Sequence, residues 1–198
     1  MFAQYNTEMN YDSAFIQKLK KGNKKSFEGL FLNTYESLCD YSASITNSKE
    51  DAEGIVQDIF ASLWTNRHSL DISVNIKAYL FKSAKNRALD IIQHKEIRKK
   101  YQDHLTSMYQ TSLNDESVSA SHIIRRVTEE VEKLPEKCKV VYLLHRRDGL
   151  TYSEIAVVLE ISKKAVEARM TKALKTLRER LQKEKNLNII PYLAILGI

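Results

Sequence analysis

Residues 134–182 carry the most specific pattern in the chain, LPEKCKVVYLLHRRDGLTYSEIAVVLEISKKAVEARMTKALKTLRERLQ. Pro135 is favoured at the first position of a helix, and Gly149 is typical of a helix end. Thr151 and Glu154 have the spacing of a capping box, in which each side chain bonds the backbone of the other residue. The stretch therefore predicts three helices: one that begins at Pro135 and is stopped by Gly149, one over Tyr152–Leu159, and one from Ser162 to about Gln182.

The second and third of these helices predict a helix-turn-helix. The short helix has Ile155, Ala156 and Leu159 on one side, which we expect to face the core. The turn at residues 160–162 contains Ile161, which we expect to be buried. A short helix, a three-residue turn and a basic second helix together form this motif. The apolar stripe of the longer helix consists of Val166, Met170, Ala173, Leu174, Leu177 and Leu181.

The start of the longer helix favours DNA as its ligand. Lys163 and Lys164 lie in the first turn, where the helix dipole disfavours each cation by ~0.3–1 kcal/mol. DNA binding would recover this free energy, because the N-terminal part of a recognition helix reaches base edges while its neighbours contact phosphates. The alternative is a basic amphipathic helix packed in a plain bundle. The candidate contacts are Thr151, Ser162, Lys163, Lys164, Glu167, Ala168, Arg169, Thr171 and Lys172.

The composition of the whole chain also favours helices. Its 198 residues include 5 Gly and 2 Pro, well below the average usage of ~7% and ~5%. This scarcity argues against turn-dense β-sandwiches and glycine-loop nucleotide folds. The net charge of +6 suggests a polyanionic partner. Cys39 and Cys138 lie far apart in sequence, so no disulfide framework or CxxC metal site is expected, and the reducing cytosol is the expected compartment.

Charge alternates along the chain. Residues 28–71 hold 2 basic and 8 acidic residues, residues 77–100 hold 8 and 2, and residues 162–185 hold 9 and 3. Residues 101–121 contain no Lys or Arg, hold 3 acids and lack a sustained apolar period. We predict an all-α protein of two small helical domains, residues 1–100 and 122–185, with a flexible acidic linker at 101–121 and an apolar tail at 186–198.

The best helix of the first domain is expected over Asp51–Trp64, with Ser48 as its N-cap. Gly54 lies on its acidic face, where glycine costs ~1 kcal/mol relative to alanine. This face is either a solvated surface or a place where a partner approaches closely. The apolar stripe is Ala52, Ile55, Val56, Ile59, Phe60, Leu63 and Trp64, and the opposite face is Asp51, Glu53, Gly54, Gln57 and Asp58.

One or two further helices are expected over Lys77–Lys100. Their cations, beside the aromatic Tyr79, could follow a phosphate backbone and contact unstacked bases. The alternative is a helix with a Lys-rich solvated face. The expected apolar side is Ala78, Leu80, Phe81, Ala84, Ala88, Leu89, Ile91 and Ile92, and the polar residues off it are Lys77, Lys82, Lys85, Asn86, Arg87 and Lys95.

Other classes of function lack their signatures in this sequence. The N-terminus has no signal-peptide pattern and no run approaches ~18 apolar residues, so insertion in a membrane is not expected. The five His are scattered without metal-ligand spacing, and we interpret them as hydrogen-bonded or exposed side chains. No GxGxxG or GxSxG motif occurs. We therefore expect no enzyme activity, no cofactor and no metal site.

Four phrases, in their order and spacing, resemble the bacterial RNA polymerase sigma factors of the extracytoplasmic-function (ECF) group. The resemblance covers about Tyr11 to Gln182. The chain departs from the common pattern at Gly54, where an acid is frequent, and at Glu160, where glycine is frequent. The phrases are DAEGIVQDIFASLW from Asp51, AYLFKSAKNRALDII from Ala78, LPEKCKVVYLLHRRDGLTYSEIAVVLEIS from Leu134 and VEARMTKALKTLRERL from Val166.

This resemblance implies that the first domain is sigma region 2. Its Asp51–Trp64 helix would bind the clamp helices of the largest polymerase subunit, where complementary charge speeds association and fixes register. The Lys77–Lys95 segment would recognise and open the minus-10 element, and its contacts would recover the few kcal/mol that flipping a base costs. The implied polymerase contacts are Asp51, Glu53, Gln57 and Asp58; the implied minus-10 contacts are Asn86 and Arg87 near an extruded base and Lys77, Lys82, Lys85 and Lys95.

The second domain would be sigma region 4. The helix after Ser162 would enter the major groove of the minus-35 element, and an outer apolar surface would contact the flap of the second-largest subunit. The acidic linker would occupy the RNA-exit path. The resemblance also implies an anti-sigma factor, often membrane-bound, that wedges the domains together, and a chain that is monomeric when free. The tail at 187–198 lies outside the family pattern and either docks on region 4 or serves a regulator.

Two other functions stay open on the sequence alone. A stand-alone helix-turn-helix regulator would use the first domain to sense a signal and would bind duplex DNA as a dimer. A helical adaptor would use the Asp51–Trp64 helix and would not depend on the basic helices. The reading favoured by the sequence is a promoter-specificity subunit that is not itself catalytic.

Overall fold

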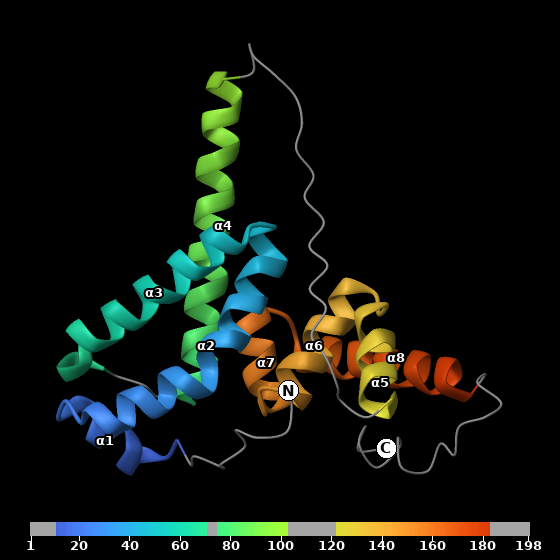
Figure 1. Cartoon of the computed structure of the whole chain (residues 1–198), viewed down its shortest axis with the longest axis horizontal. Helices are drawn as coiled ribbons and strands as arrows, with labels where there is room; N and C mark the ends of the chain where they lie inside the picture. The colour runs from blue at the N-terminus through green and yellow to red at the C-terminus, as the bar shows by residue number, and fades with distance from the viewer. Residues whose placement is uncertain (1–10, 71–74, 103–121, 183–198) are drawn as a thin grey trace.

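The computed structural model describes residues 11–70, 75–102 and 122–182, and these residues are almost entirely helical (Figure 1). The predicted linker beyond residue 102 and the predicted tail lie outside the described residues. Within the described ranges, no helix combines the length and apolarity needed to cross a bilayer. The elements are α1 (Ser13–Lys20), α2 (Lys24–Thr46), α3 (Lys49–Thr65), the 3-10 turn η1 (Arg67–Ser69), α4 (Ile76–Gln102), α5 (His122–Glu132), α6 (Glu136–Arg146), α7 (Tyr152–Leu159) and α8 (Lys163–Gln182).

An aromatic cluster joins α2 to α3 in the first domain. Phe31 packs on Phe60 with ring centroids 4.9 Å apart, and Phe27 lies 4.9 Å from Trp64. The guanidinium of Arg67 lies over the Trp64 ring, 4.7 Å from its centre. This contact covers one side of the ring at the C-terminal end of α3. These contacts fix the face of α3 that points inward, so the acidic residues of α3 are left on the outer face.

The predicted helix around Asp51 is confirmed and extends slightly at both ends. Ser48 is its N-cap and accepts a hydrogen bond from the backbone N–H of Asp51. The predicted apolar stripe is buried except for Trp64, which is half-buried because it forms the outer wall of the aromatic cluster. The local pattern therefore sufficed to define α3.

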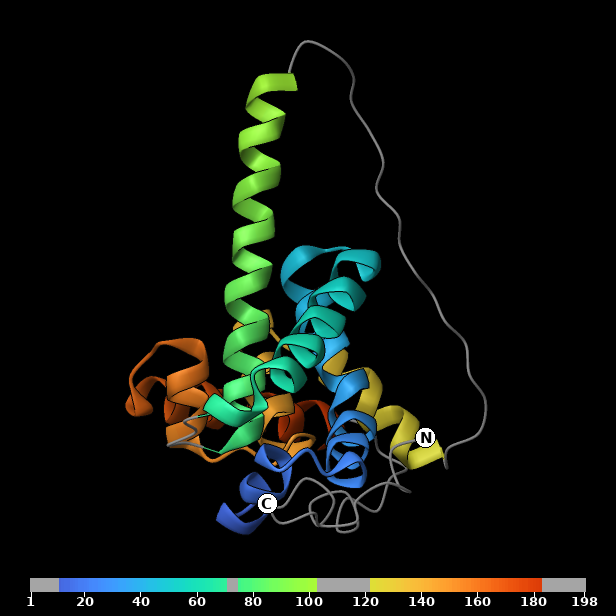
Figure 2. The same cartoon turned by 90° about the vertical axis from the view of Figure 1, so that its left-hand side faces the viewer.

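The segment from Lys77 forms one helix, α4, which ends at Gln102, two residues past position 100. The backbone N–H of Lys77 donates to the Asn75 side chain at 2.9 Å, which caps the first turn. Its C-terminal half extends beyond the other helices in both views (Figure 2). Leu89, expected on the apolar side, is 46% exposed although its neighbour Ala88 is buried, so Leu89 lies off the face of α4 that packs in the bundle.

The second domain begins with α5 and α6. Pro135 is the N-cap of α6, not its first helical residue, because its ψ of 134° is extended. Gly149 follows the helix with a φ of +73°, a conformation that favours glycine. The Nδ1 atom of His145 lies 2.8 Å from the carbonyl oxygen of Leu150, so this histidine is hydrogen-bonded within the fold, as interpreted from the sequence.

The helix-turn-helix is confirmed by α7, its turn and α8. The capping box is complete: the Thr151 hydroxyl accepts from the Glu154 N–H at 3.3 Å, and the Glu154 carboxylate accepts from the Thr151 N–H at 2.7 Å. The predicted stripe of α8 is buried, with Leu174 only partly so. In α7 the core positions are Ile155 and Val158.

Three of the expected core positions around α7 are less buried than predicted. Ala156, Leu159 and Ile161 are only partly buried. The turn lies against α4 of the first domain, so these residues pack at the edge of the second domain and not at its centre.

The two domains pack against each other through α7 and α4 (Figure 1). Buried residues of both domains form one continuous hydrophobic cluster, which runs from Phe15 in α1 to Leu181 in α8. The helix α4 is therefore covered by α2 and α3 on one side and by α7 on another. This contact between the domains had no signal in the sequence.

Gly54 provides a test of the exposed face of α3. A Cβ atom added at Gly54 would meet nothing within 4 Å, so the structure gives no steric reason for glycine. We expect Gly54→Ala to raise the free energy of unfolding by about 0.5–1 kcal/mol, because alanine is the better helix former. Urea unfolding followed by circular dichroism measures this change.

Gly22 is the matched control, since its φ is +76° and an added Cβ would lie 3.2 Å from Arg67 Nε. Gly22→Ala should therefore lower the stability. A loss of stability in the Gly54 variant as well would contradict the open surface seen at α3.

Candidate functional site

The first half of α8 presents a continuous polar and cationic face. Ser162 caps the helix by accepting from the Ala165 N–H at 3.1 Å. The Thr171 hydroxyl donates to the carbonyl oxygen of Glu167 at 2.9 Å, one turn back on the same face. Of the candidate minus-35 contacts, Arg169 is half-buried and the others are exposed: Thr151, Ser162, Lys163, Lys164, Glu167, Ala168, Thr171 and Lys172.

Lys163 and Lys164 make this face suited to an anion. Both are exposed in the first turn, where no acidic residue balances them. Two cations near the positive end of a helix dipole repel each other and the dipole, and a phosphate placed there relieves both repulsions. Because the apolar stripe of α8 is buried against α6 and α7, this polar face is the one left for a ligand.

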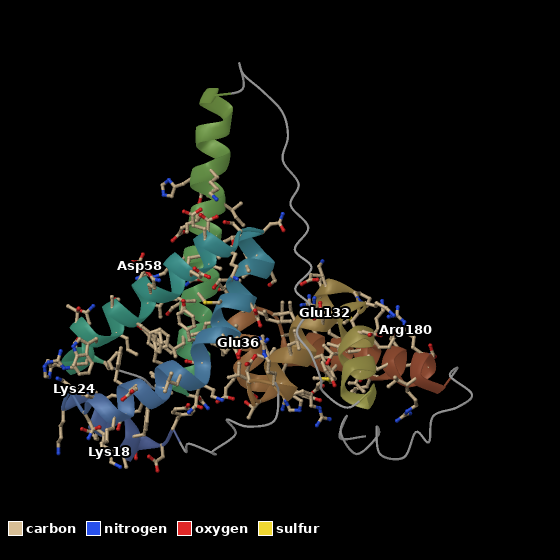
Figure 3. All side chains as sticks on the ribbon, in the orientation of Figure 1. Lys18, Lys24, Glu36, Asp58, Glu132 and Arg180 are labelled. Carbon is tan, nitrogen blue, oxygen red and sulfur yellow. The ribbon has the colours of Figure 1, made fainter. Side chains whose placement is uncertain are left out.

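The acidic face of α3 is exposed at its centre. Gln57 and Asp58 point to solvent, and Asp58 lies on the opposite side of the molecule from Arg180 of α8 (Figure 3). Glu53 is half-buried near the Cys39 thiol of α2, whose pKa is raised by burial and by this carboxylate among others. Asp51 is mostly covered, so the four candidate polymerase contacts differ in accessibility.

Two acids of α3 pair with two cations of α4. Lys95 donates to the Asp51 carboxylate, and this hydrogen bond with that from Ser48 lowers the pKa of Asp51. Arg87 lies 3.4 Å from the Asp58 carboxylate. The sequence placed these residues on two separate surfaces, whereas the structure brings the candidate polymerase-binding face and part of the candidate minus-10 set side by side.

Two other cations of α4 contact the second domain. Lys77 Nζ donates to the backbone carbonyl of Asp148 at 2.9 Å, and burial lowers the pKa of this lysine. Lys85 Nζ lies 2.7 Å from a carboxylate oxygen of Glu160, in the turn between α7 and α8. Lys82 is half-buried, and its charge helps to lower the pKa of Glu160. Asn86 and Lys95 are the exposed members of the candidate minus-10 set.

Residues that the sequence analysis did not single out also hold the two domains together. Arg147 donates to the Asp40 carboxylate at 2.7 Å and to the Ser37 carbonyl at 3.3 Å, both on α2. Asp148 is only 4% exposed, and burial raises the pKa of its carboxyl although Arg147 opposes the shift. These partners lie far apart in sequence, and no local spacing could have paired them.

Comparison with known proteins identifies both domains. Residues 30–100 match the family model described as Sigma-70 region 2, and residues 124–177 match the model described as Sigma-70, region 4. Together the two matches cover more than half of the chain, in the order region 2 and then region 4. The first spans α2, α3 and α4, and the second spans most of the α5–α8 domain.

Several curated proteins are similar to the chain over most of its length. The ECF RNA polymerase sigma factor SigW of Bacillus subtilis is 24% identical over 182 residues, which covers 84% of this chain and 95% of SigW. The RNA polymerase sigma factor NccH of Alcaligenes xylosoxydans is 25% identical over 183 residues, which covers 89% of this chain and 97% of NccH.

Solved structures share the fold. CnrH in complex with the cytosolic domain of CnrY matches with a TM-score of 0.53 at 22% identity, over 89% of this chain and 100% of that chain. The sigma factor RpoE of Bartonella quintana, in complex with the anti-sigma factor NepR, matches with a TM-score of 0.57 at 19% identity, over 81% and 99%. With both regions present in order, the chain belongs to the sigma-70 family of RNA polymerase sigma factors and is of the ECF type.

Proposed function

We propose that the chain is a promoter-specificity subunit that directs core RNA polymerase to promoters and aids their melting. In this proposal α3 binds the polymerase, α4 contacts the minus-10 element, and α8 contacts the minus-35 element. The observation that carries the proposal is the exposed cationic face at the start of α8, within a helix-turn-helix of a sigma-70 family chain. Its site of action would be the cytoplasm, where the polymerase and the promoter are found.

The faces of α3 and α8 suit their proposed partners chemically. Gln57 and Asp58 can accept hydrogen bonds from a basic partner surface, and the first turn of α8 can contact phosphates and base edges. An anti-sigma factor is a further proposed partner, supported by the complex of the similar sigma factor RpoE with NepR.

In vitro transcription tests the proposal directly. The full chain is added to core polymerase with a library of promoter fragments, and transcript ends are mapped by sequencing. The proposal expects start sites that core polymerase alone does not select. A stand-alone regulator would instead bind duplex DNA tightly without polymerase, and an unchanged set of start sites would reject the proposed function.

A double substitution tests the polymerase-binding face. Gln57→Ala combined with Asp58→Ala should weaken binding to core polymerase about tenfold, because both side chains are exposed at the centre of the acidic face. Titration of fluorescently labelled chain with core polymerase measures the dissociation constant.

Glu28→Ala on α2 is the control for this pair, since it removes one exposed carboxylate, as Asp58→Ala does. Its affinity for core polymerase should stay close to that of the parent chain. If the parent chain, the double variant and Glu28→Ala bind core polymerase with equal affinity, the assignment of α3 to the polymerase interface is wrong.

A further inference from the structure

We propose that the corner between α1 and α2 binds the phosphates of single-stranded DNA and extends the proposed minus-10 surface beyond the start of α4. Residues 18–25, which form this corner, hold five lysines and no acid. Four of the lysines are exposed, and Lys20 is half-buried. Lys18 and Lys24 lie at one end of the molecule, on the opposite side from Arg180 of α8 (Figure 3). The set, named the basic corner below, is Lys18, Lys20, Lys21, Lys24 and Lys25.

The backbone holds the basic corner in a fixed shape. The N–H of Asn23 donates to the Lys18 carbonyl oxygen at 3.0 Å, and the N–H of Gly22 donates to the Leu19 carbonyl oxygen at 2.9 Å. These two hydrogen bonds form a Schellman motif, and the φ of +76° at Gly22 is the conformation that this motif needs. Asn23 then caps α2 by accepting from the Ser26 N–H at 3.0 Å. A ligand therefore has to order only the lysine side chains, which lowers the entropic cost of binding.

The basic corner is anchored to the first domain where α3 ends. Leu19 of α1 is 2% exposed, and Phe27 of α2 packs on Trp64 of α3. The backbone at Gly22 comes so close to η1 that an added Cβ atom would lie 3.2 Å from Arg67 Nε. These contacts hold the corner beside the connection that leads from α3 to α4.

The lysines of the basic corner have no internal counter-charge. Within residues 11–70, 75–102 and 122–182, no ion pair involves any of them, whereas four cations of α4 have acceptors. Lys24 and Lys25 lie in the first turn of α2, which contains no acid, so they repel each other and the helix dipole. The start of α8 has the same arrangement, and a phosphate relieves both repulsions.

The helix α1 connects the start of α4 with the basic corner. Lys77 Nζ of α4 lies 5.5 Å from the centre of the Tyr11 ring, which packs edge-on against Phe15 of α1. From there α1 advances ~1.5 Å per residue, so the corner lies roughly 15 Å farther along. A strand that rises at least ~3.4 Å per nucleotide spans this distance in about four nucleotides. A strand in contact with the start of α4 can therefore reach the corner.

The chemistry of the basic corner fits a DNA strand better than a lipid surface. Helices that bind membranes insert exposed apolar side chains beside their cations, but Leu19, the apolar residue of the corner, is buried. Lysines bind phosphates as point charges and do not select a sequence through them. The identity of the strand rests on the proposed minus-10 role of α4, and the corner would add affinity to that contact without adding specificity.

Fluorescence anisotropy of a labelled single strand of about 14 nucleotides, titrated with the full chain, tests the phosphate contacts. Lys24→Gln combined with Lys25→Gln removes two charges and relieves the repulsion in the first turn of α2, so the fold is not weakened. We expect the affinity to fall about five- to tenfold at low salt. The slope of log affinity against log salt should decrease in magnitude by about 1.4, because each phosphate contact contributes ~0.7.

Two controls decide whether this effect belongs to the basic corner. Lys49→Gln combined with Lys137→Gln removes the same charge from exposed lysines of α3 and α6, and its affinity and slope should stay close to those of the parent chain. Equal losses in the two double variants would reject the proposal, since net charge alone would explain them. Cosedimentation with phosphatidylserine vesicles tests the lipid alternative. If the corner variant loses vesicle binding but keeps its oligonucleotide affinity, the proposal is wrong.

In vitro transcription separates this inference from the proposed function. With core polymerase, the corner variant should use the same start sites as the parent chain, because phosphate contacts carry no sequence information. Its transcript yield should fall at a lower salt concentration than that of the parent. An equal salt dependence would reject the extension of the minus-10 surface. If the parent selects no start sites while the oligonucleotide result holds, the proposed function fails and the phosphate-binding surface stands.

Discussion

Replacing Lys164 with glutamate is expected to lower transcription from a promoter that needs its minus-35 element by at least tenfold. Lys164 is exposed in the first turn of α8. In the proposed function this end of the helix contacts base edges in the major groove. A specific contact to a base edge is worth about 1–3 kcal/mol, and the reversed charge adds repulsion from the phosphates. In vitro transcription with saturating sigma factor measures the loss, and a titration with core polymerase should show unchanged affinity.

The control for this charge reversal is Lys175→Glu. Lys175 is exposed farther along the same helix, so the change in net charge is equal but its position lies beyond the first turns. Its effect on transcription should be much smaller. If both variants lose activity equally, non-specific attraction accounts for the effect, and if polymerase affinity falls together with transcription, the assignment of α8 to the minus-35 element is wrong.

Phe81→Ala should have the largest effect on stability, a loss of about 3–5 kcal/mol. Phe81 is 1% exposed and packs edge-on against Tyr41 of α2, with ring centroids 5.4 Å apart. Removal of the ring leaves a cavity among residues of α2 and α4 that have little freedom to close it. Because a domain is stable by only about 5–15 kcal/mol, a large share of the folding free energy would be lost.

Urea unfolding of the full chain, followed by circular dichroism, measures this loss. Tyr79→Ala is the matched control, since Tyr79 is an aromatic residue of α4 that is 37% exposed. We expect it to cost less than about 1 kcal/mol. Equal losses for the two variants would contradict the orientation of α4 in the bundle.

Local sequence signals predicted most of the fold. The Thr151–Glu154 capping box, the Ser48 and Ser162 caps and the apolar stripes of α3 and α8 each depend on residues within a few turns of one another. Their physical causes act at short range, so they can be read from the sequence. The exception at Pro135 is also local, since proline is compatible with both an N-cap and a first helical position.

The arrangement of the candidate site could not be predicted in the same way. Arg147 and Asp40 are 107 positions apart, and Lys85 and Glu160 are 75 apart. Surface ion pairs of this kind contribute little free energy, so they leave no pattern in hydrophobicity or in helix propensity. The sequence shows only that Glu160 departs from the family pattern at a position where glycine is frequent. The structure adds that Glu160 has a positive φ and that its carboxylate contacts Lys85.

The helix α4 contacts both domains, and these contacts change how strongly its cations can attract nucleic acid. Of the five cations among its candidate minus-10 residues, four already bind acceptors in this chain: Lys77, Lys85, Arg87 and Lys95. A lysine or arginine that stays paired with an internal carboxylate neutralises no DNA phosphate, so it releases no condensed counterion from the DNA. We therefore expect the cations of α4 to attract nucleic acid less strongly in the free chain than the same number of unpaired cations would.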